Sequence, residues 1–347
     1  MAQLSQDLGA GWFSDPRTTR TVDEGRHKAT AITARDDPLI VTLRLVIGQQ
    51  SACRWGSRNH RKSSYASERI LLLMDDTYLA SGFADVDASS NTDAFSDCLV
   101  LLDSLPYFRE YKQHTYELLN LSNGTSVLDV GCGVGDDVVR MAELVSPNGR
   151  IVGVDASASM IERATARDDL PSGLLEFRQC DAKALPFGDS AFDRCRIDRV
   201  LQHISEPTVS ISEMVRALKP GGLIVAYDND WGTFSINSGN VEVTRIVQDL
   251  WTSSFTSPWI GRYLRPYFVQ AGLAEVVIYP SNSIICEFDI ADKVYNLRQT
   301  LRRAVGNNMI SEEEGAAWIS ELVELTKGGG FTCALTAYIA VGRKPPA

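Results

Sequence analysis

The fold of this chain is decided by one stretch, Val127-Leu128-Asp129-Val130-Gly131-Cys132-Gly133-Val134-Gly135-Asp136-Asp137, in which a short apolar run leads into three alternating glycines. An apolar run of this length is typical of a buried strand. The glycines that follow let the backbone adopt positive φ and lie close to a bulky ligand. A helix that begins near Asp136 would present its free backbone N–H groups to that ligand. The stretch therefore predicts a strand, a ligand-binding turn and a helix.

Three further motifs follow at the spacing of successive parallel strands. Ile151-Val152-Gly153-Val154-Asp155 closes on an acid twenty residues after Gly135, and a carboxylate in that place can accept both hydroxyls of a ribose. Asp181, in Phe177-Arg178-Gln179-Cys180-Asp181-Ala182, stands at the expected tip of a third strand and is placed to accept from an adenine amino group. Leu218-Lys219-Pro220-Gly221-Gly222 then predicts the end of a helix before the buried strand Leu223–Tyr227.

These motifs, in this order, resemble the class I S-adenosylmethionine-dependent methyltransferases, in particular the branch that includes the ubiquinone and menaquinone biosynthesis enzymes. The clear resemblance covers roughly residues 107–230, and a weaker one continues to Gly342-Arg343-Lys344-Pro345. It implies an α/β fold with a Rossmann-like seven-stranded sheet, an antiparallel last strand, helices on both faces and helical lid insertions.

The same resemblance implies S-adenosylmethionine as the cofactor. For the helix that carries Lys112, two interpretations stay open: it braces the sheet, or, as the resemblance implies, it forms one wall of the cleft with Lys112 near the methionine carboxylate of that cofactor. The residues implied to contact the cofactor are Asp129, Gly131, Gly133 and Gly135 at the methionine end, Asp155 at the ribose, Ala156 and Met160 beside the adenine, Asp181 and Ala182 at its edge, and Arg199 through its backbone.

Two other classes of protein compete for the glycine loop. A nicotinamide-dependent oxidoreductase typically carries the motif G-x-G-x-x-G, which lets the loop approach a pyrophosphate. In this chain Asp136 occupies the position of the third glycine. A carboxylate is a poor neighbour for pyrophosphate, whereas it attracts a sulfonium and an α-ammonium. The second rival is a cofactor-binding protein without catalysis, which an intact cofactor site beside a cleft without an acceptor pocket would favour.

Two residues are candidates for a general base. Methyl transfer from a sulfonium needs a base only if the acceptor must lose a proton at the attack step. His203 follows the fourth predicted strand and Asp228 closes the fifth, with Asp230 as a competitor for the second role. His203 and Asp228 resemble the His and Asp bases of small-molecule sugar O-methyltransferases. For His203, capping of the next helix or support of the loop is an equally open alternative.

The acceptor is predicted to be a small molecule, with an aromatic, quinone or polyketide-like metabolite ahead of a sugar or an amine. Aromatic residues gather in the predicted lid, where either a pocket for a planar substrate or simple core packing explains them, and core packing is favoured. They are Trp231, Trp251, Trp259, Tyr263 and Phe268.

The predicted organisation has three parts. They are a poorly ordered N-terminal extension over 1–70, a helical cap over 71–121 and a methyltransferase domain over 122–347 with lid helices near 241–271 and 290–326. Within the last part, one helix is expected over Ile290–Ala304, a sixth strand over Glu275–Tyr279 and a final strand over Phe331–Val341.

Composition limits the partners and the compartment. A net charge of -10 disfavours nucleic acid, whose phosphates need clustered Lys and Arg. Four histidines without H-x-x-x-H spacing indicate no metal site, and seven scattered cysteines indicate a reducing compartment. The apolar run Pro38–Gly48 is too short to span a bilayer, and the N-terminus lacks the pattern of a signal peptide. We therefore expect a cytoplasmic protein without stable membrane insertion, as a monomer or a homodimer.

Overall fold

The computed structural model describes residues 78–170 and 175–346. The prediction for residues 1–70 lies outside these residues, and the predicted helical cap is described only from residue 78.

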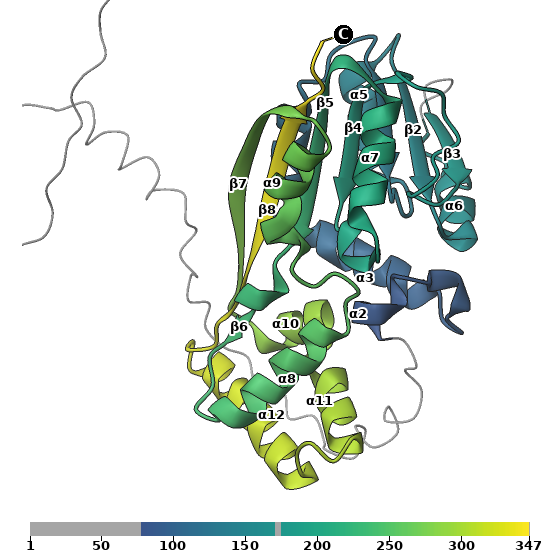
Figure 1. Cartoon of the computed structure of the whole chain (residues 1–347). Helices are drawn as coiled ribbons and strands as arrows, with labels where there is room; N and C mark the ends of the chain where they lie inside the picture. The colour runs from purple at the N-terminus through teal and green to yellow at the C-terminus, as the bar shows by residue number, and fades with distance from the viewer. Residues whose placement is uncertain (1–77, 171–174, 347) are drawn as a thin grey trace, which may run out of the picture. The chain divides into compact units, whose positions relative to one another are not determined.

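The centre of the fold is a mixed sheet in the order β3-β2-β1-β4-β5-β8-β6, with β7 paired along the opposite edge of β8 (Figure 1). The first five strands are parallel, and β8 runs antiparallel to β5, β6 and β7. The predicted Rossmann-like α/β fold with an antiparallel last strand is thus confirmed, with the two-residue β6 as an addition. The strands are β1 Ser126–Val130, β2 Arg150–Asp155, β3 Leu175–Gln179, β4 Phe192–Asp198, β5 Leu218–Asn229, β6 Ser235–Ile236, β7 Ala274–Ile285 and β8 Cys333–Arg343.

Helices cover both faces of this sheet. Alternate residues of each strand point to opposite faces, so Val127 of β1 packs into one core and Leu128 into the other. The first core includes α4 and α5, and the second includes α7 and α9, which Figure 1 shows on one face of the sheet. The helices are α2 Leu79–Gly82, η2 Val86–Ala88, α3 Asp93–Ser104, α4 Pro106–Leu119, α5 Asp136–Val145, α6 Ala158–Thr165, η3 Leu201–His203, α7 Pro207–Ala217, η4 Trp231–Thr233, α8 Val241–Ser253, α9 Ile260–Gln270, α10 Phe288–Tyr295, α11 Leu297–Gly306 and α12 Glu312–Lys327.

The predicted strand, turn and helix around the glycines are confirmed. β1 ends at Val130, and the backbone N–H of Gly131 then donates to the carbonyl of Val154 on β2 at 2.7 Å. Gly131 has φ 73° and Gly135 has φ 84°, which only glycine adopts without strain. A Cβ on Gly131 would also overlap Cγ2 of Val200, so a side chain at this position requires Val200 to move.

The predicted lid divides into two structures. Helix α9 packs against β5, β7 and β8 and therefore belongs to the helical layer of the sheet. Helices α8, α10, α11 and α12 pack against one another beyond the end of the sheet (Figure 1).

The prediction of one continuous helix over Ile290–Ala304 is wrong. The helix is interrupted at Asn296, which has φ 45° and separates α10 from α11. Asparagine tolerates this left-handed conformation, and its Oδ1 accepts a hydrogen bond from the backbone N–H of Leu79 at 3.2 Å. The break is thus tied to a segment more than 200 residues away, which helical periodicity does not register.

Replacement of Gly131 by alanine tests the turn. Gly221 is a matched control, because it also has positive φ (79°) but a Cβ there meets nothing within 4 Å. Gly221→Ala should lower the free energy of unfolding by about 1–2 kcal/mol through backbone strain alone. Gly131→Ala should lose about 1–3 kcal/mol more, because Val200 must move. Equal losses in urea denaturation would show that the close approach to Val200 is unimportant.

Candidate cofactor and acceptor site

A buried cation holds the floor of the site together. Arg196 of β4 is only 1% exposed and contacts carboxylates from three elements. Its Nη1 lies 3.2 Å from both Asp129 Oδ1 and Asp137 Oδ2, and its Nη2 donates to Asp198 Oδ2 at 2.7 Å. Arg196 Nε donates to Thr115 Oγ1 of α4. This set ties β1, β4, α4 and α5 into one unit below the glycine turn.

Asp137 has the most partners in this floor. Lys112 Nζ lies 2.9 Å from both of its oxygens, and the Tyr116 hydroxyl donates to Oδ1 at 2.5 Å. Burial by itself would raise the pKa of the Asp137 carboxyl, but Arg196 and Lys112 outweigh burial and hold it well below its usual range. Lys112 lines the cavity above, yet both oxygens of Asp137 already accept from its ammonium. In this structure Lys112 is therefore already paired with Asp137 and is not free to bind a carboxylate of the cofactor.

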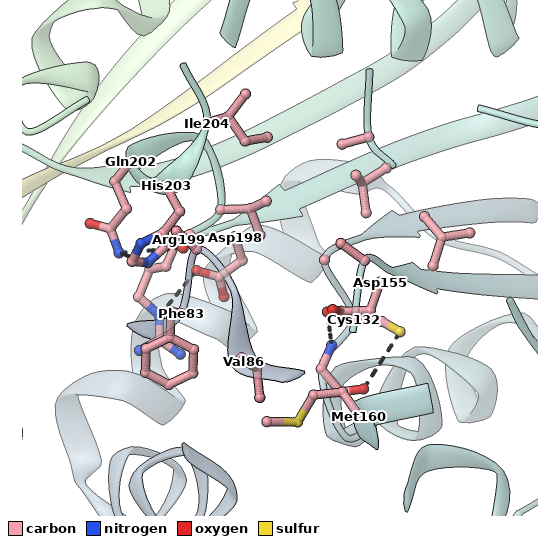
Figure 2. A pocket seen from close by; sticks show the side chains of 18 of the residues that line it. Phe83, Val86, Cys132, Asp155, Met160, Asp198, Arg199, Gln202, His203 and Ile204 are labelled. Carbon is pink, nitrogen blue, oxygen red and sulfur yellow. Dashed lines mark hydrogen bonds and ion pairs between the residues drawn. The ribbon is translucent and has the colours of Figure 1, made fainter. Parts of the chain in front are cut away.

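Above this floor lies a cavity of about 370 Å³. Figure 2 shows Asp155, Cys132 and Met160 on one side of it and Arg199, Gln202 and His203 on the other. Most of the residues predicted to bind the cofactor line this cavity, namely Gly131, Gly133, Asp155, Ala156, Met160, Asp181, Ala182 and Arg199.

Two residues predicted at the cofactor do not line the cavity. Asp129 points down to Arg196, whose guanidinium counteracts the rise that burial causes in the pKa of this carboxyl. Gly135 is the N-cap of α5, where a Cβ would press on the ring of Phe177. Both residues shape the turn from outside the cavity.

The carboxylate of Asp155 both organises the loop and leaves room for a ligand. Its Oδ2 accepts from the backbone N–H of Gly133, and its Oδ1 accepts from that of Ser157, each at 2.9 Å. Burial raises the pKa of this carboxyl from its usual value. Because a carboxylate has about four lone-pair positions, two remain for the hydroxyls of a ribose. These two free acceptor positions fit the two ribose hydroxyls of S-adenosylmethionine.

Asp136 also lines the cavity, but its charge is not free. Arg167 Nη1 lies 2.5 Å from its Oδ1, so the carboxylate is paired before any cationic ligand arrives. The predicted attraction of Asp136 for a sulfonium is correspondingly reduced.

The segment of residues 83–87 closes one side of the cavity. The contacts that hold this segment in place were not predicted from the sequence. Phe83, Ala84 and Val86 line the cavity. Next to them, Asp87 accepts from the hydroxyls of Ser157 and Ser159 and from the first backbone N–H groups of α6. Hydrogen bonds from Ser159 and Ser157 lower the pKa of Asp87 to about 2. These partners are about 70 residues apart in sequence, so no local pattern reveals the contact.

The two predicted bases lie in different environments. His203 lines the cavity, but burial and the neighbouring Arg199 lower its pKa to about 3. Asp228 lines neither of the two cavities described and is fully buried. Its oxygens accept from the backbone N–H groups of Gln202 and Asn229, and burial raises its pKa to about 8. Asp228, predicted as a candidate base, therefore has no access to either cavity and instead supports the turn that carries His203. Its competitor Asp230 is paired with Arg262.

A second cavity of about 60 Å³ adjoins the first. Phe83, Arg199, Gln202 and His203 line both cavities and form the wall between them. The predicted aromatic cluster is divided. Trp231 and Trp251 line the second cavity, Trp259 and Tyr263 are exposed, and Phe268 of α9 is buried in the core.

Within residues 78–170 and 175–346, no group of three or more His, Cys, Asp or Glu side chains is arranged to hold a metal ion. Among the same residues, none of the helices has the length and apolar character needed to cross a bilayer.

Comparison with known proteins agrees with this geometry. A family described as methyltransferase domain matches residues 121–255. A protein of transposon TN4556 from Streptomyces fradiae, described as uncharacterized, is 34% identical over 240 residues, or 69% of this chain and 68% of that protein. The demethylmenaquinone methyltransferase of Shouchella clausii is 26% identical over 208 residues, or 55% of this chain and 88% of that enzyme. The ubiquinone/menaquinone biosynthesis C-methyltransferase UbiE of Pseudomonas fluorescens is 36% identical over 122 residues, or 35% of this chain and 48% of that enzyme.

The sheet order, the glycine turn and these relatives define the class of protein. The chain belongs to the class I S-adenosylmethionine-dependent methyltransferases, and S-adenosylmethionine is its cofactor. This result excludes the nicotinamide-dependent oxidoreductase and the non-catalytic cofactor-binding protein.

Asp155→Ala tests the place of the ribose. If two lone pairs of this carboxylate hold the ribose hydroxyls, each lost bond costs about 1.5–3 kcal/mol. The affinity for S-adenosylmethionine, measured by calorimetry, should then fall at least about tenfold. Unchanged affinity in a folded variant would remove Asp155 from the cofactor site.

Asp87→Ala tests the contact between the segment of residues 83–87 and α6. Loss of these hydrogen bonds should loosen the segment over the cavity and weaken cofactor binding by about two- to tenfold. Asp97→Ala is the matched control, because Asp97 is an exposed residue of α3 whose side chain has no hydrogen bond or ion pair within the described part of the chain. Equal affinities of the two variants in calorimetry would show that Asp87 does not help to close the site.

Proposed function

We propose that this enzyme methylates a planar, oxygenated aromatic small molecule of the quinol type. The observation that carries the proposal is the second cavity, which adjoins the cofactor cavity and is lined largely by aromatic rings. Trp231 stacks on Phe255 with ring centroids 4.5 Å apart and meets Trp251 edge to face at 5.4 Å. Such rings favour another flat ring in offset or edge contact.

The charge of the lining supports an oxygenated ring over an amine. None of the described residues that line the second cavity carries a carboxylate, whereas Arg199 brings a cation. An alkylammonium acceptor would find no opposite charge there. A sugar is disfavoured because many polar groups of the lining already bond to one another, as in the Tyr107–Tyr227 and Ser283–Tyr295 pairs. Few groups are then left for the many hydroxyls of a sugar, and unpaired polar groups are costly to bury.

The second cavity must enlarge to admit a ring. A protein cavity of about 150 Å³ binds benzene, whereas this one measures about 60 Å³. Its lining includes Leu79 and Phe83 from the short α2 and the residue after it. We infer that this segment moves when the acceptor enters and that its return excludes water from the cofactor.

The chain's residues position the reaction rather than drive proton transfer. When bound, S-adenosylmethionine supplies an electrophilic methyl group to a nucleophilic atom of the acceptor. Asp155 would hold the cofactor, and the wall formed by Phe83, Arg199 and His203 would set the direction from which the acceptor approaches. Holding the two reactants in line supplies much of the rate acceleration. A base with a pKa of about 3, as in His203, is too weak to remove a proton efficiently near neutral pH. An electron-rich ring carbon or a phenolate needs little such help.

The relatives support this acceptor class. The names of the Shouchella and Pseudomonas enzymes place quinone precursors among the acceptors of similar chains. We further propose that residues 71–121 act as a cap on a methyltransferase domain that begins near residue 122. The enzyme would work in the cytoplasm as a monomer or a homodimer, without nucleic acid, for which the net charge of -10 is unsuited.

A labelled-methyl assay tests the acceptor class. The protein is incubated with methyl-labelled S-adenosylmethionine and, separately, with reduced 1,4-naphthoquinol, a hexose and a primary alkylamine. Label should appear in the naphthoquinol alone, and Phe255→Ala should reduce that transfer because it removes the ring stacked on Trp231. Label in the hexose or the amine but not in the naphthoquinol would contradict the proposal.

A further inference from the structure

The orientation of the Gln202 side chain is determined by its neighbours. Trp231 Nε1, which can only donate a hydrogen bond, lies 2.9 Å from Gln202 Oε1. Asn229 Nδ2 donates to the same oxygen at 3.1 Å. The amide nitrogen of Gln202 must therefore point the other way, where it donates to the backbone carbonyl of Arg199 and lies 3.1 Å from His203 Nε2.

This orientation fixes the tautomer of His203. Because Gln202 Nε2 is a donor, His203 Nε2 must accept, so the proton of the neutral ring lies on Nδ1. His203 Nδ1 is buried and has no hydrogen-bond partner in the structure. The ring thus offers an N–H donor rather than a lone pair at this atom.

Two more unpartnered donors line the same space. Among the described residues around the second cavity, the buried side-chain nitrogens without a hydrogen-bond partner are Arg199 Nε, His203 Nδ1 and Trp251 Nε1. All three are donors, and no lining side chain has a buried oxygen that lacks a partner. An unsatisfied buried donor costs about 1–3 kcal/mol, so a ligand that supplies an acceptor oxygen recovers this energy.

The local charge favours an electron-rich oxygen. Arg199 lies over the ring of Phe108, and its Nε is 3.5 Å from Asp198 Oδ1 without donating to it. Asp198 also accepts from Arg196 and from Tyr111, so its negative charge is shared among three partners. Arg199 is therefore left with positive charge directed at the wall between the cavities.

We propose that the wall between the two cavities binds the acceptor through an oxygen lone pair, with His203 Nδ1–H and Arg199 as donors, and that Gln202 and Trp231 hold His203 in the donor tautomer. This inference rests on the proposed function and narrows it to acceptors that carry a carbonyl, phenol or phenolate oxygen. His203 is then an acceptor-binding residue and not the general base expected from its position in the sequence.

The tautomer is measured on the protein without any acceptor. The chain contains four histidines, so ¹⁵N-histidine labelling gives few signals, and loss of one set in His203→Asn assigns His203. Long-range ¹H–¹⁵N spectra should show a protonated Nδ1 and an unprotonated Nε2, unchanged between about pH 5 and 8 because the pKa of His203 is lowered to about 3 by burial and by Arg199. A proton on Nε2, or a doubly protonated ring in this range, would overturn the inference whatever the acceptor is.

Acceptor binding is then compared in two variants. 1-Naphthol and the oxygen-free naphthalene serve as probes, with S-adenosylhomocysteine bound to prevent turnover. His203→Leu should weaken 1-naphthol binding about tenfold or more, as expected for a lost hydrogen bond in a charged surrounding. His203→Asn should recover part of this loss, since its Nδ2 lies near the place of the histidine Nδ1 but cannot act as a base.

The controls separate the competing explanations. Naphthalene affinity should be the same in His203→Leu and the wild type, and so should S-adenosylhomocysteine affinity. Equal 1-naphthol affinity in wild type and His203→Leu, or a loss of S-adenosylhomocysteine affinity in its place, would overturn the inference and assign these donors to the cofactor. If the wild type binds neither probe, the proposed acceptor class fails, and the tautomer measurement still decides the role of His203.

Discussion

The site depends on one buried cation. Arg196 is the point at which β1, β4, α4 and α5 meet, through Asp129, Asp198, Thr115 and Asp137 respectively. A guanidinium that is 1% exposed is tolerated only with several partners, because its desolvation is otherwise costly. This requirement fixes where β1 ends and α5 begins, and hence where the glycine turn can place its N–H groups. The contacts of Arg196 thus hold in place the glycine loop that shapes the cofactor cavity.

The sequence was sufficient for the order of the central elements but not for the contacts between them. β1, the turn and α5 carry local signals, since the apolar run, the positive-φ glycines and the acidic helix start are all contiguous. The break at Asn296 and the contact of Asp87 with α6 depend on partners far away in the chain. Asp228 was misplaced for another reason. Its strand residues alternate between the two cores, and only the register of β5 decides which set faces the cleft.

The turn from Arg199 to His203 connects the cofactor cavity with the proposed acceptor cavity. It lies at the carboxyl end of β4, where Arg199 adopts φ 56°, an uncommon conformation for a residue with a side chain. Asp228 accepts from this turn through Gln202, and Trp231 holds the Gln202 amide. Residues that resemble an acid–base pair in sequence therefore act as a support and a donor in our account. This is consistent with methyl transfer to an electron-rich ring, where alignment matters more than proton removal.

The dependence of the site on Arg196 is tested most directly by a double-mutant cycle between Arg196 and Asp129, read out as the free energy of unfolding in urea. Arg196→Met should cost about 3–5 kcal/mol, because it leaves buried carboxylates without their cation. Asp129→Asn in the same chain removes one of those charges. The account predicts that the double variant loses at least about 1 kcal/mol less than the sum of the single variants. Additivity within about 0.5 kcal/mol would contradict it and show that the buried cation does not hold the end of β1.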